Sequence, residues 1–370
     1  MVKFKLIIME NQIKIMKVQS DDLENVVNTV KRYINTYETQ VSPMAIRFLF
    51  FYSDNPDFAA QFDELRKELV PIGYIPFVQQ DGENFVEVSR RPPVRYRENW
   101  VNLVMLVLTL ASTIYVGSQL SADFVSPGPD AVYISILYGF VFFSLPLMLI
   151  LGIHELGHYI VARRFAVKAS LPFFIPFPIG LGTFGAFISL RDPIPSRKAM
   201  AEIGAAGPIF GFLTALPLLF VANYLKDIYT PVENTFPYLI HLPIIYNLFG
   251  LTSSSITPVF PMVFAVWVGM FATAMNLLPV GQLDGGHVVR GLLGRRSTFI
   301  GYAFVIFLII IGTFYTGWWI LAIFVIFVGI NHPPALDDYS KLSRRDIAIG
   351  IFALVMFVLT FTIIPLSQAP

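Results

Sequence analysis

The chain has 370 residues, of which 55% are hydrophobic and only 14% are charged, and its mean hydropathy is +0.65. Soluble globular proteins carry about a quarter charged residues, so this excess of apolar side chains predicts a protein partly solvated by lipid. The formal net charge of +1 excludes the broad basic field of a nucleic-acid-binding protein, and the absence of cysteine excludes disulfides and thiolate metal sites.

The first part of the chain is the most polar and predicts a small α+β domain. Four stretches carry a secondary-structure periodicity, which is helical in Asp21–Ile34 and Asp57–Leu69 and extended in Ala45–Tyr52 and Tyr74–Ser89. The last of these predicts a hairpin that turns at Asp81-Gly82, and a basic, proline-broken linker follows at Arg90–Pro93. We expect a soluble domain over residues 1–95, with an interaction or regulatory role, and a membrane domain over residues 96–370.

Beyond this linker, long apolar stretches predict a mainly α-helical, polytopic transmembrane bundle. Stretches of roughly 20 apolar residues are long enough to cross a hydrocarbon core of about 30 Å. We count seven: Trp100–Leu120, Ala131–Ala162, Ala199–Leu225, Val259–Leu278, Phe299–Phe314, Trp318–Ile330 and Asp346–Pro365. The fifth and sixth are short, so the number of segments lies between six and eight. Gly207-x-x-x-Gly211 in the third stretch predicts close helix packing.

The basic residues of the loops give an orientation. Lysine and arginine gather in five connections, at residues 90–97, 163–168, 191–198, 290–296 and 341–345. The alternate connections, residues 121–130, 226–258 and 315–317, carry one lysine between them. Because basic loops stay on the cytoplasmic side, we expect a multi-pass protein of the cell membrane with a cytoplasmic N-terminal domain.

A metal-binding pattern, His154-Glu155-Leu156-Gly157-His158, lies in the second apolar stretch. Two histidines four positions apart share one helix face, so both imidazoles can bind one Zn²⁺, and Glu155 beside them can take a proton from the water that the metal binds. The alternative is that these are helix residues without a function. An ionisable group at mid-membrane costs about 2.5–3.5 kcal/mol, so three within a turn and a half favour a functional site.

The segment Pro172–Leu190 is too rich in proline and glycine for a helix, and its second half predicts a strand. We expect a short membrane-associated β-hairpin at the cytoplasmic rim, dipping toward the metal. A substrate helix must unwind before it is cut, and an unpaired strand edge at Thr183, Phe184 and Gly185 would hold it extended. The alternative is a re-entrant loop that only fills space.

A third protein ligand is expected, because catalytic zinc usually takes three. Asp284 is the candidate, at the end of the fourth apolar stretch, where Pro279 and Gly281 would break the helix and bend the chain toward the site. Asp284 could instead cap the helix that follows. His287 shares a face with Asp284 and could replace it as ligand or support it, and Glu202 is a weaker alternative.

These motifs together resemble the site-2 proteases, intramembrane zinc metalloproteases, and most of all their archaeal and plant-chloroplast branch. The similarity covers about residues 100–338. Its pieces are His154–His158, Gly182–Phe187, Ala205–Gly211 and the pattern Asn276-x-x-Pro279-x-x-x-Leu283-Asp284-Gly285-Gly286.

The resemblance implies a role for each matched polar residue. His154, His158 and Asp284 would bind one Zn²⁺ per chain, and Glu155 would activate the water. Asn276 would hold the substrate backbone or the developing oxyanion. A buried asparagine could equally hydrogen-bond a broken helix end.

We therefore predict an intramembrane zinc metalloprotease that hydrolyses peptide bonds within or near transmembrane helices of other membrane proteins. A transporter would show internal repeats or charges dispersed along a pathway, and neither is present in the sequence. A catalytically inactive scaffold that binds transmembrane helices has no need of Glu155. A membrane-anchored zinc protease acting on soluble chains commonly uses a glutamate as third ligand.

Overall fold

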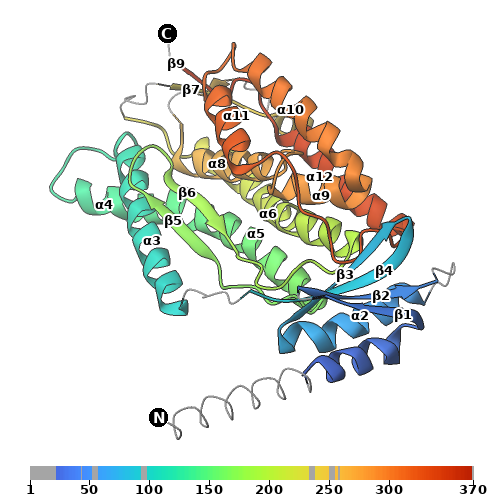
Figure 1. The fold of residues 1–370 in the computed structure, drawn as a ribbon. Helices are drawn as coiled ribbons and strands as arrows, with labels where there is room; N and C mark the ends of the chain where they lie inside the picture. The colour runs from blue at the N-terminus through green and yellow to red at the C-terminus, as the bar shows by residue number, and fades with distance from the viewer. Residues whose placement is uncertain are drawn as a thin grey trace, which may run out of the picture. The chain divides into compact units, whose positions relative to one another are not determined.

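The computed structural model describes residues 22–42, 44–51, 57–92, 98–232, 238–249, 255–256 and 259–368. Its chain divides into two compact units, shown as a ribbon in Figure 1. The N-terminal unit contains residues 1–95 together with Ala335–Ser340, and the membrane unit contains Tyr96–Pro334 and Lys341–Pro370.

The N-terminal unit is an antiparallel sheet packed on helices. Its strands are β1 (Thr36–Val41), β2 (Ala45–Phe50), β3 (Tyr74–Asp81) and β4 (Glu83–Arg90), in the order β1-β2-β4-β3. The helices are residues 22–33 and α2 (Phe58–Leu69), followed by the 3-10 turn η1 (Val70–Ile72). Apolar side chains of both helices and of the sheet form one core. The predicted helix, strand and hairpin in this region are confirmed; Gly82, with φ of 75°, forms the hairpin turn.

Strand β1 was not predicted. It lies at the edge of the sheet, and all its side chains are exposed or half-buried. A strand without a buried face shows no apolar alternation, so its sequence gives no period-two signal.

A distant segment completes the N-terminal unit. Leu336 is only 3% exposed and belongs to the core of this unit. The backbone N–H of Val78 in β3 donates to the Leu336 carbonyl at 2.9 Å, and the N–H of Gln80 donates to the Tyr339 hydroxyl at 3.2 Å. Residues 335–340 therefore cover the outer edge of β3.

The membrane unit is mainly helical. Its helices are α3 (Asn99–Ala122), α4 (Ala131–Tyr138), the π-helical turn η2 (Gly139–Ser144), α5 (Leu145–Arg164), α6 (Arg197–Lys226), α7 (Ile244–Leu248), α8 (Pro261–Asn276), α9 (Asp284–Leu293), the 3-10 turn η3 (Gly294–Arg296), α10 (Ser297–Ile311), α11 (Gly317–Val328) and α12 (Arg344–Thr360). Two small sheets accompany them, β5 (Phe173–Phe177) with β6 (Gly182–Phe187), and β7 (Tyr238–His241) between β8 (Ser255–Ile256) and β9 (Leu366–Gln368).

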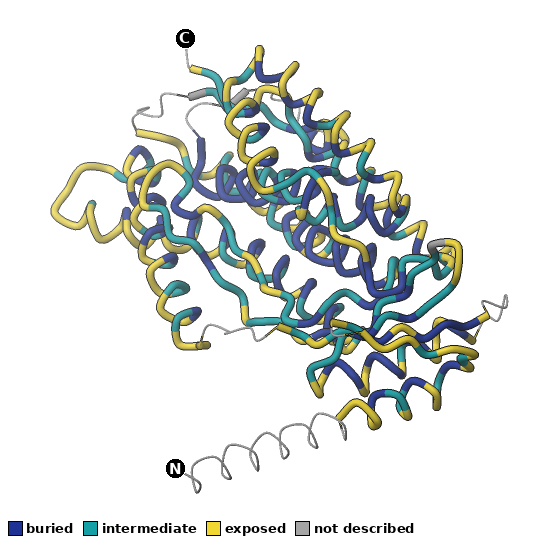
Figure 2. Tube along the Cα trace, in the orientation of Figure 1, coloured by how far each residue is buried: buried dark blue, intermediate teal, exposed yellow. Residues whose placement is uncertain are grey.

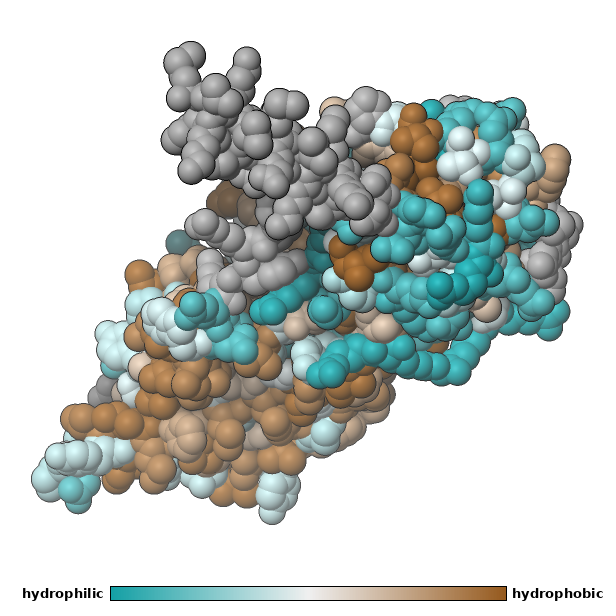
Figure 3. Space-filling view, turned by 60° about the horizontal axis from the view of Figure 1, so that its bottom comes forward, coloured by the Kyte–Doolittle hydropathy of each residue, from teal (hydrophilic) through white to brown (hydrophobic). Residues whose placement is uncertain are grey.

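Four helical stretches among the described residues are long and apolar enough to cross a membrane. They are Asn99–Ala122, Ala131–Arg164, Arg197–Lys226 and Asp284–Ile311. Two shorter apolar helices, Pro261–Asn276 and Gly317–Val328, accompany them. Hydrophobic side chains cover much of the visible face of the membrane unit in Figure 3, as expected of a surface that contacts lipid. The count of seven crossings remains a prediction.

Helices α5, α6 and α8 form the interior of the membrane unit. Their apolar side chains share one buried cluster, and buried stretches follow all three helices in Figure 2. Helix α8 is buried over most of its length, from Pro261 to Met270 without a break. A polar group on the buried faces of these helices is therefore largely removed from both water and lipid.

The predicted β-hairpin is present as the antiparallel pair β5–β6. Polar side chains of α3 hold it in place, because Asn102 donates to the Leu171 carbonyl and Ser112 donates to the Gly182 carbonyl, each at 2.7 Å. Among the described residues, β6 has β5 as its only strand neighbour, so its second edge is unpaired.

Candidate metal centre

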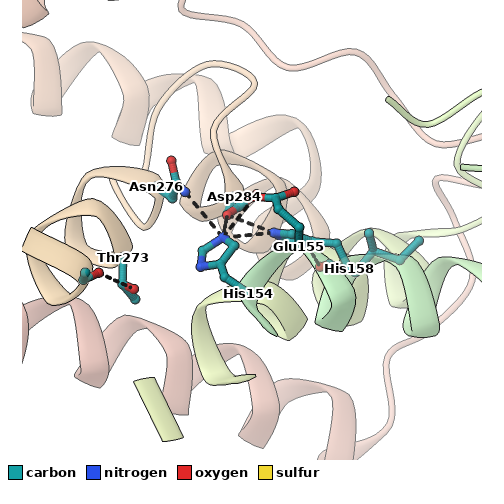
Figure 4. A network of polar contacts seen from close by, with 8 residues as sticks. His154, Glu155, His158, Thr273, Asn276 and Asp284 are labelled. Carbon is teal, nitrogen blue, oxygen red and sulfur yellow. Dashed lines mark hydrogen bonds and ion pairs between the residues drawn. The ribbon is translucent and has the colours of Figure 1, made fainter. Parts of the chain in front are cut away.

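Two histidines of α5 face each other inside the membrane unit. His154 and His158 are 2% and 6% exposed, and their Nε2 atoms lie 3.2 Å apart. The spacing of four positions brings both rings to one side of the helix. Figure 4 shows the His154 ring directed toward Asp284.

Asp284 completes a triangle of ligand atoms. Its Oδ2 lies 3.2 Å from His154 Nε2 and 3.1 Å from His158 Nε2. A tetrahedral zinc ion with bonds of about 2.0–2.1 Å separates its ligand atoms by about 3.3 Å. Two imidazole nitrogens and a carboxylate oxygen are also a donor set that zinc prefers. The three residues therefore fit a zinc ion in both geometry and chemistry, and they are the metal-binding group found among the described residues.

The hydrogen bond of His158 leaves its ligand nitrogen free. Its Nδ1 lies 2.7 Å from the Ile203 carbonyl oxygen of α6. A carbonyl only accepts, so Nδ1 carries the proton and Nε2 keeps its lone pair. The same bond fixes the orientation of the ring, as is usual for metal-binding histidines.

Asp284 is the first residue of α9 rather than its cap. The cap position is Leu283, and no side chain there bonds the helix end. The capping interpretation of Asp284 is therefore wrong, because its carboxylate contacts the two histidines instead. As predicted, α8 ends before this loop, at Asn276, and Gly281 turns the chain with a φ of 60°.

The predicted glycine pair of α6 packs directly on the histidines. A Cβ on Gly207 would lie 2.0 Å from His158 Nε2, and one on Gly211 would lie 3.1 Å from His154 Nδ1. The Gly-x-x-x-Gly pattern does more than bring two helix backbones together, because it leaves the space in which the imidazoles lie.

Glu155 lies beside the metal-binding triangle. It is 3% exposed, and its Oε1 is 4.0 Å from His154 Nε2. The backbone of Ile188, just after β6, hydrogen-bonds the carboxylate. Glu155 is thus held beside the three ligand residues without belonging to the ligand group.

Asn276, the last residue of α8, also reaches the site. Its Nδ2 lies 3.3 Å from His154 Nε2 (Figure 4). The expected alternatives for the third ligand, Glu202 and His287, do not belong to the ligand triangle. Glu202 pairs with Arg164 at 3.8 Å, and His287 contacts His332 rather than the ligand triangle.

A cavity of 190 Å³ adjoins these residues. Its polar lining includes Glu155, His158, Asn276, Asp284 and His287. The lining also includes the end of β6 and the chain that follows, with Ala186, Phe187, Ile188 and Leu190.

The hairpin residues predicted to bind substrate lie just before this lining. Thr183 is buried, and its hydroxyl donates to the Ile175 carbonyl and accepts from the Gly185 N–H. Phe184 is 67% exposed, and its ring packs at a tilt against that of Phe177. Thr183 and Gly185 therefore shape the hairpin, and the lining begins at Ala186. Strand alternation alone could not locate that boundary.

Comparison with known proteins finds a matching family and relatives. Residues 142–314 match the model of peptidase family M50. Probable zinc metalloprotease EGY1, chloroplastic, from Arabidopsis thaliana is 30% identical over 303 residues, covering 74% of this chain and 55% of that protein. The protein of the same name from Oryza sativa subsp. japonica is 28% identical over 315 residues, covering 76% and 52%. The chain spans about half the length of these curated relatives.

Solved structures also align. The Site-2 Protease from Methanocaldococcus jannaschii matches with a TM-score of 0.32 and 19% identity, covering 64% of this chain and 93% of that chain.

Proposed function

Since the chain belongs to peptidase family M50, we propose that it is an intramembrane zinc metalloprotease that hydrolyses peptide bonds within or near transmembrane helices of membrane-protein substrates. The observation that supports this most is the triangle of His154, His158 and Asp284, whose ligand atoms lie 3.1 to 3.2 Å from one another. When bound there, zinc would act as a Lewis acid toward a peptide carbonyl and would acidify a coordinated water.

In the proposed hydrolysis, Glu155 is the general base. Its carboxylate lines the cavity beside the ligand triangle and is oriented by the Ile188 backbone. It would take a proton from the attacking water and return it to the leaving amine, so that the group is regenerated after each cut. A catalytically inactive binding scaffold would have no need of a general base in this position.

The end of β6 would hold the substrate backbone. A helical segment shields its carbonyls by internal hydrogen bonding, so it must be extended before hydrolysis. The second edge of β6 has no strand partner among the described residues, and its last residues line the same cavity as Glu155. Addition of the substrate as a strand to this edge would present an extended peptide to the metal.

Asn276 would bind the substrate in the same cavity. Its amide lies at the ligand triangle, 3.3 Å from His154 Nε2. An amide N–H in this place can donate to a peptide carbonyl and to the oxyanion that develops from it.

The proposed setting is a membrane with the N-terminal domain on the cytoplasmic side. The support is the distribution of lysine and arginine over alternate loops, together with four helical stretches able to span a bilayer. The N-terminal domain would serve interaction or regulation.

The test is cleavage of a membrane-embedded model substrate by the wild type, Glu155→Gln and Asp284→Ala, with zinc content measured for each. We expect Glu155→Gln to retain zinc and lose cleavage, and Asp284→Ala to lose both. Glu202→Gln is the matched control, a buried carboxyl of α6 outside the ligand group, and should keep both. Undiminished cleavage by Glu155→Gln would refute the role of Glu155 as general base. Full activity of zinc-free wild type would refute the requirement for zinc.

A further inference from the structure

A second histidine pair lies one helical turn beyond Asp284. His287 is on the same face of α9, three residues after the proposed ligand, and it lines the same cavity. It does not belong to the ligand group. Its Cβ fits against α6, where a Cβ on Gly204 would approach it to 2.6 Å. The position of this ring is therefore restricted from one side by packing.

His332 contacts the other side of that ring. It lies in the segment after α11, and its Nε2 is 2.5 Å from His287 Nδ1. The two rings meet edge to face, with centroids 4.3 Å apart. No other histidine pair outside the metal site is found in contact among the described residues.

The hydrogen bonds of this pair define its protons. His332 Nδ1 lies 2.6 Å from the Pro333 carbonyl, which can only accept, so Nδ1 carries the proton. In a neutral His332 the Nε2 is then an acceptor, and His287 Nδ1 must be the donor. The second nitrogen of a neutral His287, Nε2, is left without a proton.

The segment that carries His332 also contacts the chain before Asp284. The backbone N–H of Gly281 donates to the Ile330 carbonyl at 3.1 Å. A Cβ on Gly281 would lie 2.8 Å from the Gly329 carbonyl oxygen, so the two backbones approach as closely as glycine permits. The side chain of Ile330 packs against the buried cluster that contains Leu278 and Val280. Residues 329–332 thus contact the chain on both sides of Asp284, at Gly281 before it and at His287 after it.

We propose that His332 is a positioning residue for the metal centre, which acts through His287 to hold the first turn of α9 and so the Asp284 carboxylate at His154 and His158. This rests on the zinc site of the proposed function. The ligand triangle needs Asp284 within a few tenths of an ångström of its place, while the other two ligands share one rigid helix. The contacts that hold Asp284 in place therefore determine how well the three ligands are arranged before zinc binds.

The measurement is zinc affinity by chelator competition in the full-length protein, for His332→Ala, His287→Ala and the double variant. Mutating the hydrogen-bonded partner of a metal ligand typically weakens metal binding by about 10–100-fold, and we expect a loss within this range for His332→Ala, which acts through His287. In the His287→Ala background the same change should have little further effect, because the two residues act in series. His332→Gln offers an acceptor at a similar reach and should restore most of the affinity.

His241→Ala is the matched control, because His241 bonds the Ser367 side chain in the small β7 sheet. It should leave zinc affinity unchanged. The unfolding midpoint of the zinc-free protein, measured for each variant, separates positioning from a general loss of stability. We expect that midpoint to change little for His332→Ala. Unchanged zinc affinity in His332→Ala, or an equal loss in the presence and absence of His287, would overturn the proposal. A wild type that binds no zinc would instead refute the proposed function.

Discussion

The Asp284 Oδ2 lies 3.1 Å from His158 Nε2, although 126 residues separate the two in the sequence. One residue opens a helix that follows a broken helix end, and the other lies in the middle of a buried helix. Together with His154, they form a site of one carboxylate and two imidazoles that has little exposure to water. A bound cation would compensate the burial of the carboxylate charge there.

Zinc should stabilise the membrane unit. The ligands lie on α5 and α9, so a bound ion links two helices that are distant in sequence. A ligand that binds only the folded state adds about 2.7 kcal/mol at a concentration 100 times its Kd. We expect the unfolding midpoint in detergent to fall when a chelator is added and to recover with zinc. His154→Ala/His158→Ala should show no such dependence, and a dependence of equal size there would contradict the site.

Gly207→Ala should impair the metal site from the opposite helix. Its Cβ would lie 2.0 Å from His158 Nε2, so the ring must leave its place or α6 must move away. Overpacking of a buried contact costs about 1–3 kcal/mol. We expect lower zinc content per folded protein and a lower unfolding midpoint. Gly128→Ala is the control, because nothing lies within 4 Å of a Cβ there. Normal zinc binding by Gly207→Ala would show that the packing is looser than the structure has it.

Ala186→Pro should separate substrate binding from metal binding. Proline removes a backbone N–H from the last part of β6, where the cavity lining begins. Loss of one backbone hydrogen bond to substrate, at about 0.5–1.5 kcal/mol, lowers kcat/KM by roughly 2- to 10-fold. Zinc content should stay that of the wild type. Ala186→Val keeps the N–H and should cleave far better than Ala186→Pro; equal activity of the two would exclude strand addition at this edge.

Leu336→Ala should destabilise the N-terminal unit, although the residue lies far from it in the sequence. The side chain is 3% exposed in the core of that unit, and truncation of a buried leucine typically costs about 2–5 kcal/mol. Hydrogen exchange of β3 and β4 in the full-length protein is the measurement, and we expect faster exchange there. Met44→Ala, at an 89% exposed position, is the control. Exchange that is unchanged in Leu336→Ala would show that residues 335–340 do not belong to this core.

Elements with a strong local pattern could be read from the sequence. The apolar periodicity of α2, the Asp81-Gly82 turn and the proline- and glycine-rich hairpin each depend on neighbours along the chain. The pair His154 and His158 belongs to the same class, because a spacing of four on a helix is sufficient to bring two rings together.

Contacts between distant segments were decided only by tertiary packing. The edge strand β1 has no buried face, and nothing near Leu336 in the sequence indicates the sheet that it completes. The contact of His332 with His287, and the space that Gly207 leaves for His158, depend on which helices lie side by side. A sequence pattern indicates whether a residue is buried or requires a polar partner. Which residue becomes that partner depends on how the whole unit packs.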